Sequence, residues 1–220
     1  MIRPLTAGLL IGAFLVGGCA LASLNSATSP TDLYLLTPKS TFDPNLPRLR
    51  QQIVVTEPSA TAAVSNDRIT VQPTALEVKF LPGARWVDRA PLIVQTLLIE
   101  SYENSGKVDA VGNSAIGLRA DYLVVPDIRE FQAILPPNSA PGTPLQTHVR
   151  LNIKIVNDEF DRIIASRSIE RIRTSASDEA EDIVASFDDA LGAVMKEAVE
   201  WSVRIMHADA QSNQDVADNF

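Results

Sequence analysis

Cysteine, histidine and aromatic residues are all scarce in this chain of 220 residues, which has one cysteine, two histidines and 5 % aromatic residues. A lone thiol forms no disulfide within the chain. His148 and His207 stand in no metal-ligand spacing such as His-Glu-x-x-His, and the sequence contains no nucleophile elbow, P-loop or paired-glycine nucleotide motif. The sequence therefore predicts no catalytic residue, no metal site and no bound cofactor, and an enzyme is the least favoured class.

Basic residues are also in deficit. The chain has 19 Lys and Arg residues against 27 Asp and Glu residues, which gives a net charge of −8 at pH 7. This balance argues against nucleic acid as a partner, and against binding to anionic lipid by charge alone. The hydrophobic content of 45 % and the charged content of 21 % are typical of a folded globular protein. The length suffices for one domain with a substantial core, or for two small domains.

The single cysteine, Cys19, follows Leu15-Val16-Gly17-Gly18 and an apolar run that begins at Leu5, with Arg3 before it. A basic start, an apolar segment and small residues before a cut site are typical of a secretory signal peptide, here residues 1–18. A cysteine directly after the cut resembles a bacterial lipobox, in which the thiol takes a diacylglycerol and the new N-terminus takes an N-acyl chain. The pattern predicts that Cys19 is a lipid attachment site.

Three other interpretations of this segment remain open: an uncleaved membrane helix, an ordinary signal peptide with an incidental cysteine, and an apolar core segment. Residues 19–31 are rich in Ser, Thr and Ala, which predicts a flexible tether between the lipid and the domain. Ala20, as the second residue of the mature chain, favours retention in the outer membrane over the inner membrane.

The first half of the domain contains short β-branched or alternating runs that end at proline or glycine, which predicts strands. These expected strands are residues 32–38, 53–56, 68–71 and 76–80, with a proline-containing loop over 39–51. Trp86-Val87-Asp88 is expected to open the first helix, with Asp88 as its cap and Pro91 in its first turn. Gly106 is expected to end this helix.

The second half contains the clearest strand, because Val149, Leu151, Ile153 and Ile155 alternate with polar residues. Further strands are expected at 108–111, 122–133 and 163–173, with a turn at 158–161. Ser177 is expected to cap a last helix with an apolar stripe from Ile183 to Ile205, followed by a polar, disordered tail over 207–220. These elements predict one α+β domain over residues 32–206: a mixed or mostly antiparallel sheet with two α-helices packed on one face.

Two groups of side chains are candidates for docking a partner. Arg150, Lys154, Arg167 and Arg171 lie on the two strands before the last helix and could form a face for an acidic partner. The alternative is a solvated outer face of a hairpin, because acidic residues lie among them. Trp86 and Asp88 form the second group, for which the alternative is a hydrophobic staple and a helix cap.

Several blocks, in this order and spacing, resemble the ABC-type transport auxiliary lipoprotein family. In addition to Cys19 they are Tyr34-Leu35-Leu36, Asp67-Arg68-Ile69, residues 83–91, Val94-Gln95-Thr96-Leu97-Leu98, residues 103–106, residues 118–122 and residues 127–131. The resemblance implies an α/β domain similar to the N-terminal domain of TolB, at the periplasmic face of the outer membrane. It also implies partners, namely an MCE-domain (mammalian cell entry) protein and an ABC permease and ATPase.

Two functions follow as hypotheses. The first is a non-enzymatic lipoprotein that anchors or docks an MCE-type ABC system to the outer membrane, for transport of phospholipids or other hydrophobic molecules. The alternative is a periplasmic lipid- or solute-binding lipoprotein with its own apolar pocket. Self-association into a homo-oligomer is compatible with either function.

Overall fold

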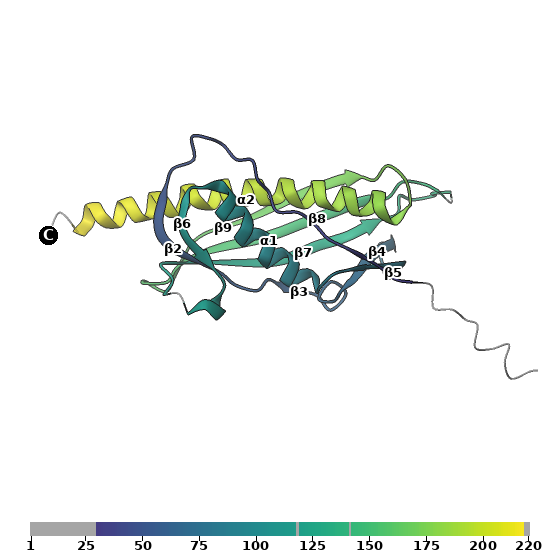
Figure 1. Ribbon diagram of the computed structural model, residues 1–220, viewed down its shortest axis with the longest axis horizontal. Coiled ribbons are helices and arrows are strands. Elements are labelled where there is room, and N and C mark those ends of the chain that lie inside the picture. The colour runs from purple at the N-terminus through teal and green to yellow at the C-terminus, as the bar shows by residue number, and fades with distance from the viewer. Residues whose placement is uncertain (1–29, 118, 141, 218–220) are drawn as a thin grey trace, which may run out of the picture. The chain divides into compact units, whose positions relative to one another are not determined.

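The structure, a computed structural model, describes residues 30–117, 119–140 and 142–217. The predicted signal peptide and all but the last two residues of the predicted tether lie outside these residues. From Thr31 onward the chain forms one compact unit with one mixed sheet and two α-helices (Figure 1). The helices are α1 (Ala90–Ser105) and α2 (Ala180–Ala217), with a short 3-10 helix, η1 (Ser114–Ile116). The strands are β1 (Asp32–Tyr34), β2 (Leu49–Val55), β3 (Ser59–Ala60), β4 (Arg68–Thr74), β5 (Glu77–Trp86), β6 (Val108–Gly112), β7 (Tyr122–Ile134), β8 (Gln146–Asn157) and β9 (Arg162–Thr174).

The long strand β7 lies at the centre of the sheet. One of its edges pairs with β8 in antiparallel register along the whole strand, and β9 continues the sheet from β8. Its other edge pairs in parallel with three short strands in succession, β2, β3 and β4. β5 pairs antiparallel with β4, and the edge strand β1 pairs parallel with β5. The predicted mixed sheet is therefore confirmed.

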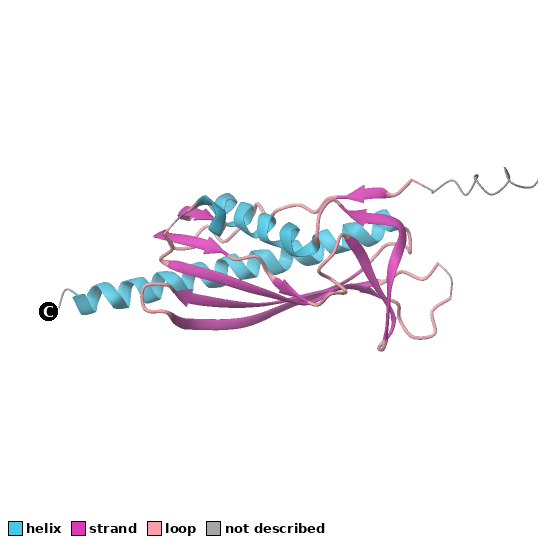
Figure 2. Ribbon diagram, turned by 90° about the horizontal axis from the view of Figure 1, so that it is seen from below, coloured by secondary structure: helices cyan, strands magenta, loops and turns pink. Residues whose placement is uncertain are grey.

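Both helices pack against one face of this sheet (Figure 2). The predicted alternation in β8 places Val149, Leu151, Ile153 and Ile155 on the helix side, where all four are buried. The predicted stripe of α2 is buried from Ile183 to Ala198, whereas Trp201 and Ile205 at its end are half-buried, and Val203 and Met206 are the buried residues there. The two helices also contact each other, because the hydroxyls of Tyr102 and Ser202 share a buried hydrogen bond of 2.6 Å.

The first helix begins later than expected. Trp86 is the last residue of β5, and α1 starts at Ala90 without a side-chain hydrogen bond at its N-cap, so the prediction that Asp88 caps it is wrong. β5 continues through Pro82-Gly83, because Gly83 takes a positive φ of 70° and absorbs the irregularity in the pairing with β4. Pro91 in the first turn and Gly106 at the C-cap are confirmed.

The C-terminal helix is longer than expected. The prediction of a disordered tail from residue 207 is wrong up to Ala217, since α2 continues to that residue. Polar side chains on this last section are held by the sheet, as described below, so an apolar stripe is not needed there. Across the described residues, neither α1 nor α2 combines the length and apolarity needed to cross a membrane.

Candidate functional site

The four basic residues predicted to share one docking face lie on two faces of the sheet. Arg150 and Lys154 take the β8 positions that point away from the helices. Arg167 and Arg171 lie opposite the buried Ile153 and Val149 in the β8–β9 register, so they are on the helix side. A bulge near Ala165 inserts one extra residue into β9. Which face Arg167 and Arg171 occupy is therefore set by the register of β9 with β8. The prediction of one joint face is therefore wrong.

The arginines on the helix side bind α2. Arg167 and Arg171 each form an ion pair of 2.6 Å with a different carboxylate oxygen of Glu197. Arg173, two residues further along the strand, pairs with Asp189. These contacts connect the edge strand to the helix that covers it, and each of these arginines has an acidic partner within the domain.

The open face of β7, β8 and β9 carries balanced charges. Arg150 donates to Glu130 at 2.6 Å, and His148 pairs with Glu170 across the β8–β9 ladder. Lys154 is exposed and has no ion-pair partner within 4 Å among the described residues. The charges on this face are mostly paired, so a strongly basic surface for an acidic partner is not what the geometry shows.

The second predicted group also divides. Trp86 is 1 % exposed and packs between Phe131 and Phe187, with ring centroids 5.9 and 5.3 Å away. It is therefore a core residue and offers no docking surface, because β5 and not a helix end places it. Asp88 is exposed, and its carboxylate accepts the backbone N–H of Arg89 at 2.6 Å. Its role in docking stays a prediction.

An extended segment crosses both helices where the sequence predicted the end of a strand, up to residue 38, and then a loop; the strand prediction is wrong beyond Tyr34, where β1 ends. We call residues 35–48 the strap (Figure 1). Its backbone contacts α2 where Thr37 N–H donates to Asp188 at 2.6 Å. It contacts α1 where Lys39 N–H donates to the Ser101 hydroxyl at 3.0 Å. Helix side chains thus satisfy strap backbone groups that have no strand partner.

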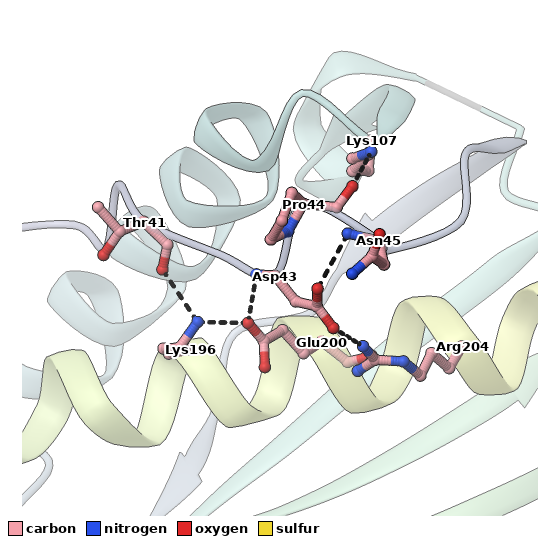
Figure 3. A network of polar contacts seen from close by, with 8 residues as sticks. All are labelled: Thr41, Asp43, Pro44, Asn45, Lys107, Lys196, Glu200 and Arg204. Atoms are coloured by element: carbon pink, nitrogen blue, oxygen red, sulfur yellow. Dashed lines mark hydrogen bonds and ion pairs between the residues drawn. The ribbon is translucent and has the colours of Figure 1, made fainter.

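The centre of the strap is Asp43 (Figure 3). Its N–H donates to Glu200 at 2.7 Å, and its carboxylate accepts the N–H of Asn45 at 2.9 Å and the guanidinium of Arg204. The Asn45 N–H, followed by Arg204, lowers the pKa of Asp43 below its ordinary value. Lys196 contacts Glu200 and the carbonyl of Thr41, so α2 holds the strap through several charged side chains.

A cavity of about 340 Å³ lies where the C-terminal part of α2 passes the ends of β7 and β8. Most of its lining is polar: Gln51, Asp121, Asn157, Glu159, Asn213 and Gln214, together with Tyr122, Phe160 and Ala210. Beside it, the carboxylate of Asp209 accepts the Tyr122 hydroxyl at 2.9 Å and the Asn157 amide at 2.7 Å. Burial, reinforced by Asp209, raises the pKa of Tyr122 well above its ordinary value.

These contacts explain the length of α2. Arg162 of β9 adds an ion pair of 3.2 Å to Asp209, whose side chain is 11 % exposed. The sequence carried little signal for this cluster, because the partners of Asp209 lie 47 to 87 residues away along the chain. Among the described residues there is no group of three or more His, Cys, Asp or Glu side chains placed to hold a metal ion.

A small apolar surface lies at the start of the folded unit. Leu33 and Leu35 are 64 % and 70 % exposed, and Val87 beside them is 44 % exposed. The predicted lipid attachment site, Cys19, lies outside the described residues. The sequence did not predict that these three side chains form a surface, although Leu35 and Val87 lie in blocks that resemble the family, because isolated exposed apolar residues are common on protein surfaces.

Comparison with known proteins gives a consistent result. The family model described as "ABC-type transport auxiliary lipoprotein component" matches residues 34–199. An uncharacterised protein of Bradyrhizobium diazoefficiens, bll6063, is 30 % identical over 170 residues, which are 77 % of this chain and 44 % of that protein. The chain therefore spans less than half the length of this curated relative.

Two solved structures are similar to the fold. The crystal structure of XCC0632 from Xanthomonas campestris matches with a TM-score of 0.75 and 29 % identity, over 82 % of this chain and 99 % of that one. A second crystal structure, of an uncharacterised protein, matches with a TM-score of 0.59 and 9 % identity, over 77 % of this chain and 97 % of that one. The second likeness concerns the fold alone.

Proposed function

Because the chain belongs to the family of ABC-type transport auxiliary lipoprotein components, we propose that it is a non-enzymatic lipoprotein that docks an MCE-type ABC system to the outer membrane. The observation that carries the proposal is the family match over residues 34–199, which takes in most of the folded unit. The proposed cargo is a phospholipid or another hydrophobic molecule. The proposed partners are an MCE-domain protein and the permease and ATPase of the same system.

The proposed anchor is the acylated Cys19. Each methylene of an acyl chain buried in a bilayer contributes about 0.8 kcal/mol, and stable anchoring takes two membrane signals, for example two acyl chains. A diacylglycerol together with an N-acyl chain exceeds that threshold. The folded unit would then face the periplasm, next to the membrane that holds its lipid.

The proposed docking role follows from the combination of tether and fold. A tethered domain meets its partner at a high effective concentration, so a modest polar interface is sufficient. The open face with Arg150 and Lys154 and the exposed Asp88 are the candidate surfaces that remain from the sequence predictions. Paired charges on such a face favour orientation and specificity over affinity. A homo-oligomer stays part of the proposal.

The alternative, a lipid carrier, is less well supported. Sites for apolar ligands are lined predominantly by hydrophobic and aromatic side chains. The cavity beside Asp209 has mostly amide and carboxylate side chains in its lining. Buried acyl chains would leave those groups without hydrogen-bond partners. We therefore favour the adaptor over the carrier.

The experiment that tests the anchor compares two chains expressed in a bacterial host. One carries Cys19→Ala behind a conventional cleavable leader, and the matched control carries Ser23→Ala behind the native leader. We expect the control to float with the outer membrane on a density gradient and the Cys19→Ala chain to be soluble in the periplasm. Both should show the same circular dichroism spectrum, and only the Cys19→Ala chain should fail to support transport. A soluble chain that supports full transport would contradict the proposed anchor.

A further inference from the structure

We propose that Leu33, Leu35 and Val87, called here the β1 strip, contact the lipid surface to which Cys19 anchors the chain. This inference rests on the lipid anchor proposed above. It assigns an orientation to the folded unit: the edge of the sheet formed by β1 faces the bilayer.

The geometry of the edge strand places the three side chains together. In β1 and the residues after it, Tyr34 is partly buried against the core and Leu36 is buried, so Leu33 and Leu35 point outward by alternation. β1 pairs in parallel with β5, and the Val87 N–H continues the ladder by donating to the Tyr34 carbonyl at 3.1 Å. Val87, which follows the buried Trp86, therefore lies on the same outward side.

The charges around the β1 strip favour a shallow apolar contact. Arg85 shares the outward side and is neutralised by Asp67 at 3.0 Å. Asp32 and Asp88 flank the strip and are exposed. An acidic domain is not drawn to anionic lipid by charge, so the contact depends on exposed leucine and valine carbons and on proximity.

Proximity is set by the length of chain before β1. Leu33 stands fourteen positions after Cys19. Whatever its conformation, a chain of that length spans at most about 50 Å. Leu33 is thus confined close to the bilayer, and at such an effective concentration a weak contact is populated.

A partner protein is the competing occupant of this surface. The tether favours the bilayer, because in any chain anchored at Cys19 the membrane is always within reach of β1, whereas a protein partner must first bind. The three aliphatic side chains also lack the aromatic anchor that dominates most protein interfaces. Lipid is therefore the occupant to which the proposal commits.

The test uses the full acylated chain in vesicles of phosphatidylcholine with brominated acyl chains. Since Cys19 is the only cysteine and its thiol is consumed by the proposed thioether to diacylglycerol, Leu35→Cys introduces one free thiol for an environment-sensitive dye. The matched control is Ile163→Cys, which is 57 % exposed on β9, near the section of α2 that carries Asp209. The strap contacts α2 at Asp188, about 30 Å along the helix from Asp209, so the two dyes report on separate ends of the unit.

We expect the emission maximum of the dye at position 35 to shift to shorter wavelength, and at least half of its emission to be quenched by the bromines. The emission of the dye at position 163 should not change. A dye at position 33, attached to Leu33→Cys, should give the same result, so the conclusion does not depend on a single labelled position. If the labelled chains float with the vesicles but the dyes at 33 and 35 behave like the dye at 163, the β1 strip does not contact lipid and the proposal fails alone. If the chains do not float, the anchor itself fails and the proposal fails with it.

Discussion

The aromatic cluster beneath α2 allows a prediction of stability. Phe187 of α2 is fully buried and meets Trp86 of β5 edge-to-face, with centroids 5.3 Å apart. Its ring centroid lies 5.1 Å from that of Phe131 on β7. Truncating a buried phenylalanine to alanine costs about 4 kcal/mol, from lost transfer free energy and the cavity left behind. Domains of this kind have about 5–15 kcal/mol of stability, so Phe187→Ala removes a large share of it.

The measurement is urea unfolding of the soluble Cys19→Ala chain, followed by tryptophan fluorescence and circular dichroism. With a slope of about 2 kcal/mol per molar urea, the expected loss lowers the midpoint by about 2 M. Phe160→Ala is the matched control, because Phe160 is exposed in the β8–β9 turn and its loss should cost less than about 0.5 kcal/mol. A Phe187→Ala midpoint within about 0.5 M of that control would refute the conclusion that this cluster joins α2 to the sheet.

Two further predictions concern contacts of the C-terminal half of α2. Asp209→Ala removes the acceptor of the buried Asn157 amide and leaves the Tyr122 hydroxyl only the Met206 carbonyl, 3.2 Å away. We expect a loss of about 1–3 kcal/mol in the free energy of unfolding and faster amide hydrogen exchange over residues 207–217. Unchanged exchange there would contradict the role given to Asp209. Because the pKa of Asp43 is lowered in the folded state, the folded chain binds fewer protons than the unfolded chain. The stabilisation of the strap by the Asp43 carboxylate is therefore complete above about pH 4, and it is lost as the pH falls through the pKa of Asp43 in the folded state. The amide resonance of Asn45 should report this titration, and Asp43→Asn should abolish it; a wild-type resonance that is constant between pH 5 and pH 2 would show that the carboxylate does not hold the strap.

Local periodicity predicted the elements that carry most of the core. The alternation around Leu151 located β8, and the stripe from Ile183 located α2, because a repeat of two or of 3.6 residues states which side chains share a face. Two helices and a mixed sheet in one domain followed from the order of these patterns. The family was recognised from short blocks whose order and spacing are themselves a property of the sequence.

Boundaries set by distant partners could not be predicted in this way. Trp86 closes a strand because β1 and β4 pair with β5, whereas its local sequence is equally suited to a helix start. α2 continues past Met206 because the carboxylate of Asp209 meets donors from β7, β8 and β9. In both cases the deciding contacts join residues far apart in the chain, and no local pattern records them.

The sequence by itself therefore determined the fold class, the long elements and the family, since these depend on periodicity and on short ordered motifs. Only the tertiary structure decided which charges are available to a partner. Arg150 and Arg171 look equivalent along the chain, yet one lies on the open face and the other is bound to Glu197 of α2. The physical reason is that alternation places a side chain on one of two faces, whereas the packing of the helices decides which face is covered.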